Sequence, residues 1–197
     1  MRMGIERYQY AAEHGDKYAQ YNLARCYETG DGVSQDYAAA IKWYRKAAKQ
    51  HLPEAQNSLG YLYLGGIGVP KNIDLALMFF RYAAEQGCNN SQITLAQYYD
   101  DIGKITQNFQ AAAYWYRKAA EQNSSVAQYY LGVCYEKGNG VPKDDVTAYM
   151  WFNLAGAQDC SRSKSTRDAI AERMSTEQIA EGQKMSREWL QKMEKCE

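Results

Sequence analysis

Two segments of the chain decide the fold: Ala-Gln-Tyr-Asn-Leu-Ala-Arg-Cys-Tyr at 19–27 and Ala-Ile-Lys-Trp-Tyr-Arg-Lys-Ala-Ala at 40–48. In the first segment, apolar or small residues recur every four positions, which predicts one face of a helix. The second segment places alanines on both sides of an aromatic pair and predicts another helix. Between them, Gly-Asp-Gly-Val-Ser at 30–34 predicts a turn, because glycine tolerates the left-handed backbone that ends a helix.

This pattern returns every 36 residues, in the leucines Leu23, Leu59, Leu95 and Leu131 and in the aromatic residues Trp43, Phe79, Trp115 and Trp151. The full repeats are predicted at 16–51, 52–87, 88–123 and 124–159. One helix pair cannot bury its apolar face alone, so neighbouring repeats must stack. We therefore expect an all-α fold, a right-handed α-solenoid (superhelix) of helix-turn-helix repeats with a concave and a convex surface.

The two ends of the chain differ from the full repeats. Residues 1–15 match only the second helix of a repeat, so the array is predicted to begin with a half repeat and to cover 1–159. Residues 160–197 are predicted to form C-terminal capping helices. One is expected over 161–173 and the other over 176–194, after Ser175-Thr-Glu-Gln178, which has the form of a capping box.

Two repeats depart from the pattern. In the third, Ile102 and Lys104 replace turn glycines, which predicts a reshaped turn. In the fourth, Asp145 stands at the position of Tyr37, Ile73 and Phe109, which predicts that the second helix of this repeat starts differently.

Composition limits the function classes. The 197 residues carry 23 basic and 23 acidic side chains, which excludes the strong positive field of a typical nucleic-acid-binding domain. No run of about 18 apolar residues occurs, so no membrane insertion is expected. The first residues contain charge and no apolar core of a secretory signal, which favours the cytoplasm for the chain as given. If an upstream signal peptide had been removed, the expected location would be the periplasm or the exterior.

The three motifs 19–27, 30–37 and 40–48 resemble the Sel-1-like repeat (SLR) family, a relative of the tetratricopeptide repeat. The resemblance covers 1–159, and the tail around 174–190 is similar to the helical cap that often follows such arrays in bacterial members. The family resemblance implies a non-enzymatic scaffold or adaptor that binds a protein or peptide partner. It implies no cofactor.

Catalytic and metal-binding patterns are weak in this sequence. His14 and His51 lie in turns of successive repeats and are not on one helix face, and no zinc-binding spacing occurs, so no metal site is expected. Ser161-Arg-Ser-Lys164 matches the Ser-x-x-Lys pattern of penicillin-recognising enzymes, without their other motifs. Penicillin binding or a hydrolase-like activity at Ser161 and Lys164 is therefore an alternative function.

Five cysteines occur, and their spacing argues against disulfides. Cys26 and Cys134 are separated by three repeats, and Cys88 and Cys160 by two, whereas a disulfide requires Cα atoms within about 7 Å. Cys196 lies in the tail. Reduced thiols are the expected state.

The partner is expected on the concave face, which first helices line in tetratricopeptide arrays. Taking 100° per residue, the side of each first helix opposite the core is predicted to hold Tyr18, Asn22, Arg25, Glu54, Ser58, Tyr61, Asn90, Thr94, Gln97, Val126, Tyr130 and Val133. Tyrosine and arginine often anchor interfaces, which favours this set as the binding site. An ordinary solvated surface is the alternative. A further alternative is a structural protein that self-associates end to end through its N-terminal half repeat.

Overall fold

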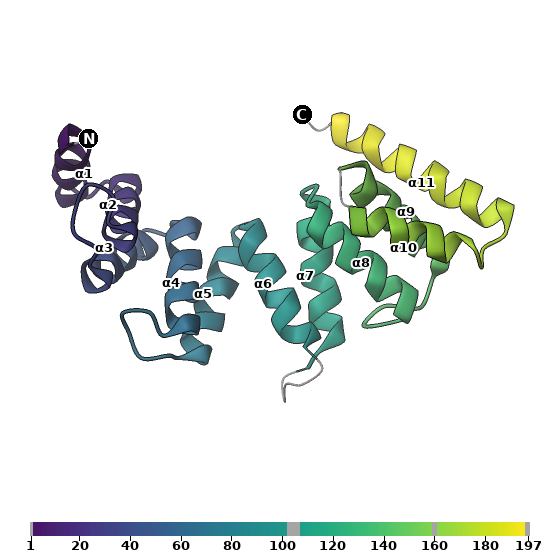
Figure 1. Ribbon diagram of the computed structural model, residues 1–197, viewed down its shortest axis with the longest axis horizontal. Helices are drawn as coiled ribbons and strands as arrows, with labels where there is room; N and C mark the ends of the chain where they lie inside the picture. Colours follow the sequence, from purple (N-terminus) through teal and green to yellow (C-terminus); the bar gives the residue numbers. More distant parts are fainter. Residues whose placement is uncertain (1, 102–106, 159–160, 196–197) are drawn as a thin grey trace. The chain divides into compact units, whose positions relative to one another are not determined.

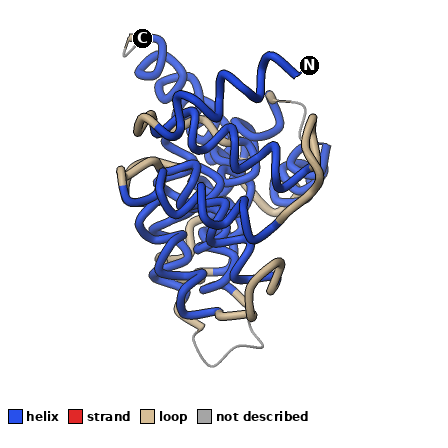
Figure 2. Tube along the Cα trace, turned by 90° about the vertical axis from the view of Figure 1, so that its left-hand side faces the viewer, coloured by secondary structure: helices blue, strands red, loops and turns tan. Residues whose placement is uncertain are grey.

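The computed structural model describes residues 2–101, 107–158 and 161–195, which form helices joined by turns with no strand in these ranges (Figure 2). In chain order the helices (Figure 1) are α1 (Arg2–Glu13), α2 (Lys17–Thr29), α3 (Tyr37–Lys49), α4 (Pro53–Gly65), α5 (Ile73–Glu85), α6 (Asn89–Asp100), α7 (Phe109–Glu121), α8 (Ser125–Lys137), α9 (Asp145–Ala157), α10 (Ser161–Ala171) and α11 (Thr176–Glu194). The prediction of an all-α fold of helix-turn-helix repeats is confirmed. Within the described ranges, no helix has both the length and the apolar character needed to cross a bilayer.

The chain forms two compact units, Met1–Gln92 and Ile93–Glu197. In the first unit, α2 packs on α3 and α4 packs on α5, as expected for the two helices of one repeat. The half repeat α1 packs on α2 in the way that α3 packs on α4. In the second unit, α8 and α9 form such a pair, and both α10 and α11 pack against α9.

The predicted helix ends are present, and each has a local cause. The first helices α2, α4 and α8 end at Gly30, Gly66 and Gly138, whose φ angles of 75°, 69° and 75° lie in the left-handed region. Each second helix begins after a side chain that accepts a hydrogen bond from a backbone N–H of the first turn, and these N-caps are Asp36, Asn72, Asn108 and Asp144.

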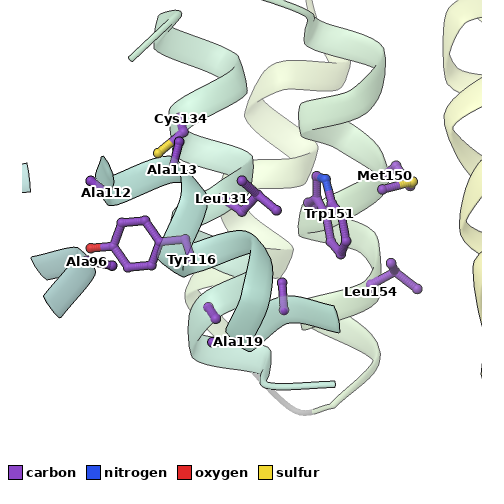
Figure 3. Close-up of a cluster of buried hydrophobic side chains, with 12 residues drawn as sticks. Ala96, Ala112, Ala113, Tyr116, Ala119, Leu131, Cys134, Met150, Trp151 and Leu154 are labelled. Carbon is purple, nitrogen blue, oxygen red and sulfur yellow. The ribbon is translucent and has the colours of Figure 1, made fainter. Parts of the chain in front are cut away.

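The core consists of the residues that recur along the repeats. The leucines Leu23, Leu59, Leu95 and Leu131 are fully buried, and so are the inner aromatic residues Tyr44, Phe80, Tyr116 and Phe152. Figure 3 shows the cluster of the second unit, in which Tyr116, Leu131 and Trp151 come from α7, α8 and α9. The outer aromatic position is buried only at Trp151, and it is half-buried at Trp43, Phe79 and Trp115.

Recurring glutamines form side-chain hydrogen bonds with each other between the two helices of a repeat. The amide of the second-helix glutamine donates to the side-chain oxygen of the buried first-helix glutamine in the pairs Gln50–Gln20 (2.9 Å), Gln86–Gln56 (2.7 Å) and Gln158–Gln128 (3.0 Å). Such pairing is required because a buried amide without a partner is costly. These glutamines are therefore part of the structural frame of each repeat.

Helices α10 and α11 follow the repeats, and the capping box of Ser175 and Gln178 is present at the start of α11. The expectation for Asp145 is wrong, because α9 begins at this residue just as α3 begins at Tyr37. Asp145 does not alter the helix start; it accepts a hydrogen bond of 3.0 Å from Arg173, which also contacts Glu136 at 3.2 Å. The turn at Ile102–Lys104 lies outside the described residues.

Candidate interaction surface

The twelve predicted partner-binding residues all lie on the first helices α2, α4, α6 and α8, and none of them is buried. We call them the first-helix surface. Seven belong to the first unit, namely Tyr18, Asn22, Arg25, Glu54, Ser58, Tyr61 and Asn90. The other five belong to the second unit, namely Thr94, Gln97, Val126, Tyr130 and Val133.

In the first unit, the large side chains of this surface differ in their roles. Tyr18 is 59% exposed, and the Nζ atom of Lys17 lies 5.3 Å from its ring centroid. The exposed Arg25 lies over the Tyr21 ring at 6.0 Å. Tyr61 is 45% exposed, but one edge of its ring packs on a core aromatic ring. Tyr18 and Arg25 are therefore the members that can be changed with least effect on the core.

A small polar pocket brings Asn22 and Arg25 together. It has a volume of about 160 Å³ and lies between Tyr8 of α1 and the side of α2 that ends at Thr29. The place of Tyr8 at this pocket could not be predicted from spacing within a repeat, because it depends on the packing of α1 on α2. Cys26 also lines this pocket, and burial raises the pKa of its thiol, which makes it a poor nucleophile at neutral pH.

In the second unit, the predicted residues are less clearly separated from the core. Val126 is 46% exposed, as expected for a surface residue. Tyr130 is half-buried and stacks on the buried Tyr116, with ring centroids 5.1 Å apart and planes 13° apart. Val133 packs against the buried cluster around Phe152. Tyr130 and Val133 therefore contribute to packing as well as to the surface.

A larger apolar pocket lies on the second-helix side of the first unit, and none of the twelve predicted residues lines it. Its volume is about 680 Å³. The lining comes from α3, the following turn, α4 and α5, through Arg45, Ala48, Lys49, His51, Gln56, Leu59, Phe79, Tyr82, Glu85 and Gln86. A signal in the sequence is the aromatic position, where this repeat has Phe79 and the other three repeats have the larger tryptophan.

The alternative site at Ser161 and Lys164 gains no support from its surroundings. Both side chains are exposed in the first turn of α10, and the buried hydroxyl of this segment belongs to Ser163. The geometry therefore places Ser161 and Lys164 on the surface of the cap.

The thiols of the described residues form no disulfide, and burial raises the pKa of two of them. Cys26, Cys88 and Cys134 are free, while Cys160 and Cys196 lie outside the described residues. Burial and the neighbouring Asp100 carboxylate raise the pKa of the Cys134 thiol to about 12. No group of three or more potential metal ligands occurs in the part of the chain that the structure describes.

Comparison with known proteins identifies the repeats. A family model described as Sel1 repeat matches residues 17–52, 53–88, 90–124 and 125–160. The chain is similar to a Sel1 repeat protein from Oxalobacter formigenes, with 30% identity and a TM-score of 0.81 over 86% of this chain and 49% of that one. It is also similar to a protective antigen with an SLR fold from uropathogenic Escherichia coli strains, with 25% identity and a TM-score of 0.50 over 96% of this chain and 56% of that one.

The chain therefore spans about half the length of each of these two proteins. A comparison with curated proteins finds no match.

Proposed function

Because this chain belongs to the Sel1 repeat family, we propose that it is a non-enzymatic scaffold that binds a protein segment on the first-helix surface of its first unit, along α2 and α4. Sel1 repeats commonly serve as scaffolds for protein–protein interaction. The observation that carries the proposal is that a first helix has one buried side, which packs in the core, and an opposite exposed side. On α2, Leu23 is fully buried while Tyr18 is 59% exposed on the opposite side.

The exposed residues are of a kind suited to binding. Tyrosine and arginine are enriched among the residues that dominate interface energies, because they bury large areas and also form hydrogen bonds. Tyr18 and Arg25 both project from α2, and Tyr61 projects from α4 in the same unit. A segment that contacts α2 and α4 would therefore meet three such anchors.

The test compares partner capture by the full chain and by Tyr18→Glu/Arg25→Glu, with purified protein as bait in a native lysate and mass spectrometry as the readout. The matched control is Tyr114→Glu/Lys118→Glu, which makes the same kinds of change at two exposed residues of α7. We expect one or more proteins to be captured by the wild type and the control and lost from the α2 variant.

Thermal unfolding of all three proteins accompanies the capture. We expect the melting temperatures to agree within a few degrees, because none of the four residues is in the core. Equal capture by the α2 variant would refute the assignment of the first-helix surface.

A further inference from the structure

The apolar pocket of the first unit has a rigid aromatic wall. Phe79 stacks on Tyr63, with ring centroids 5.7 Å apart and planes 11° apart. Arg45 donates a hydrogen bond to the Tyr63 hydroxyl and lies over the same ring. Leu59 is fully buried at the pocket, and Tyr82 is 48% exposed. The pocket thus combines a preformed apolar interior with an exposed aromatic side chain, at a volume within the about 300–1,000 Å³ usual for ligand sites.

The second unit contains the equivalent residues two repeats later. There, Arg117 donates a hydrogen bond of 2.8 Å to the Tyr135 hydroxyl, which reproduces the pair of Arg45 and Tyr63. Trp151 stands at the position of Phe79, and Leu154 at that of Tyr82. Leu154 is only 2% exposed, in contrast to the 48% of Tyr82.

The side chains that complete this second-unit cluster come from α11. Trp189 meets the Trp151 ring edge to face at a centroid distance of 5.9 Å, and Met185 packs against the same cluster. The hydroxyl of Ser186, one helical turn from Trp189, donates to the backbone oxygen of Met150 at 3.4 Å. An amphipathic helix with a tryptophan is therefore the element that this protein itself packs on the outer face of a second helix.

The charged residues around the pocket indicate which kind of helix could bind there. Helix α3 contains four basic residues and no acidic one, and two of the four, Arg45 and Lys49, line the pocket. On the opposite wall, Glu85 is the acidic residue among those that line the pocket. A bound helix would therefore be stabilised by acidic residues on the side that faces α3.

We propose that the pocket between α3 and α5 binds an acidic amphipathic helix of a partner protein, which places a tryptophan side chain against Phe79. This site is on the second-helix side of the repeats and is separate from the first-helix surface. Its occupant would share with α11 an amphipathic helix that carries a tryptophan, but it would be acidic, whereas α11 has four glutamates and three basic residues.

The test measures the binding of a fluorescein-labelled peptide of residues 175–195 to the full chain by fluorescence anisotropy. The peptide carries Lys184→Glu and Lys192→Glu, which make it acidic. We expect a Kd below about 100 µM, typical of a helix in a groove. The variants Phe79→Trp and Tyr82→Lys introduce side chains that other repeats carry at these positions, so they are compatible with the fold. Each is expected to weaken binding about tenfold by filling the pocket or removing its exposed ring.

Two controls identify the site. Tyr114→Lys changes an exposed tyrosine on α7 and is expected to leave the affinity unchanged. A peptide with Trp189→Ala is expected to bind about tenfold more weakly. If the peptide instead bound by displacing the chain's own α11, Phe79→Trp would not change the affinity of the peptide. That result would overturn the proposal. Absence of peptide binding would overturn it as well.

Discussion

The hydroxyl group of Tyr44 donates a hydrogen bond of 2.5 Å to the carboxylate of Glu28. Tyr44 is fully buried, and burial together with the Glu28 charge raises the pKa of Tyr44 far above its usual value, so its hydroxyl stays protonated. In the next repeat both partners change together, to Leu64 and Phe80. In these two repeats, the buried tyrosine is matched with an acid and the buried phenylalanine with an apolar residue. In the fourth repeat, the buried Phe152 is accompanied by Glu136, which contacts Arg173 instead.

This relationship predicts coupling between the two positions. We expect Tyr44→Phe and Glu28→Leu each to lower the free energy of unfolding by about 1–2 kcal/mol, because each leaves a polar partner without its hydrogen bond. The double variant reproduces the residues of the next repeat and should cost less than the sum by about 1 kcal/mol. Urea unfolding of the four proteins measures this, and strictly additive effects would contradict it.

A second pairing concerns the glycines that face phenylalanine. A Cβ atom at Gly60 would lie 2.6 Å from the Phe80 ring, and one at Gly132 would lie 2.7 Å from the Phe152 ring. The repeats with tyrosine at this position have Ala24 and Ala96 instead. We expect Gly60→Ala to destabilise the protein by about 1–3 kcal/mol through overpacking.

The matched control for this prediction is Gly65→Ala in the same helix. A Cβ atom there would meet only the exposed Ile67 side chain, at 3.1 Å. Alanine should therefore be neutral or stabilising by up to about 1 kcal/mol, as its helix propensity implies. Equal melting temperatures for the two variants would show that Phe80 can move aside.

The buried leucine positions predict a large cost for truncation. Leu95 is fully buried, and we expect Leu95→Ala to lower the free energy of unfolding by about 2–5 kcal/mol, because it removes a large side chain from a packed core. Val126→Ala, at a residue 46% exposed, should change it by less than about 0.5 kcal/mol. Chemical denaturation compares the two, and a small effect at Leu95 would mean that this site collapses without a cavity.

The contact between Arg173 and Asp145 predicts a dependence on pH. Hydrogen bonds from Arg173 lower the pKa of Asp145 below its ordinary value of 3.8. The folded protein then binds this proton less tightly than the unfolded chain does. The contact therefore stabilises the fold above the unfolded pKa, and this contribution is lost as the pH falls through the depressed pKa.

We expect Arg173→Ala to melt about 2 °C below the wild type at neutral pH, since exposed ion pairs contribute little. The difference should shrink toward zero as the pH is lowered to about 2. Arg187→Ala, at an exposed arginine of α11, serves as the control and should show no such trend. A difference that stays constant with pH would mean that Arg173 acts through packing rather than charge.

Much of the fold was predictable because its signals are local. Asp36 and Asn72 each follow a turn, and their side chains cap the next helix. Gly30 and Gly66 end helices because glycine readily adopts the left-handed backbone conformation. The place of Asp145 was not predictable in this way. Its departure from the repeat pattern is matched by Arg173, a residue 28 positions later in the cap.

The exposure of the candidate site residues was predictable in part. Helical periodicity correctly kept Tyr18 and Arg25 out of the core, because the side of a helix opposite its buried leucines faces away from the packing. The same rule could not show that Tyr130 stacks on Tyr116, since that contact depends on the distance between two helices.

The amino-acid sequence by itself determined the repeat length, the helix pairs, their caps and the buried positions, because these follow from spacing along one chain. Only the tertiary structure showed that the first unit has an open apolar pocket at Phe79. Phe79 and Trp151 occupy equivalent positions, yet Trp151 contacts Trp189 from the C-terminal helix, while Phe79 lines a pocket formed by α3, α4 and α5. The smaller Phe79 is visible in the sequence, but the contact of Trp151 with Trp189 depends on where a distant segment packs, which spacing within a repeat does not determine.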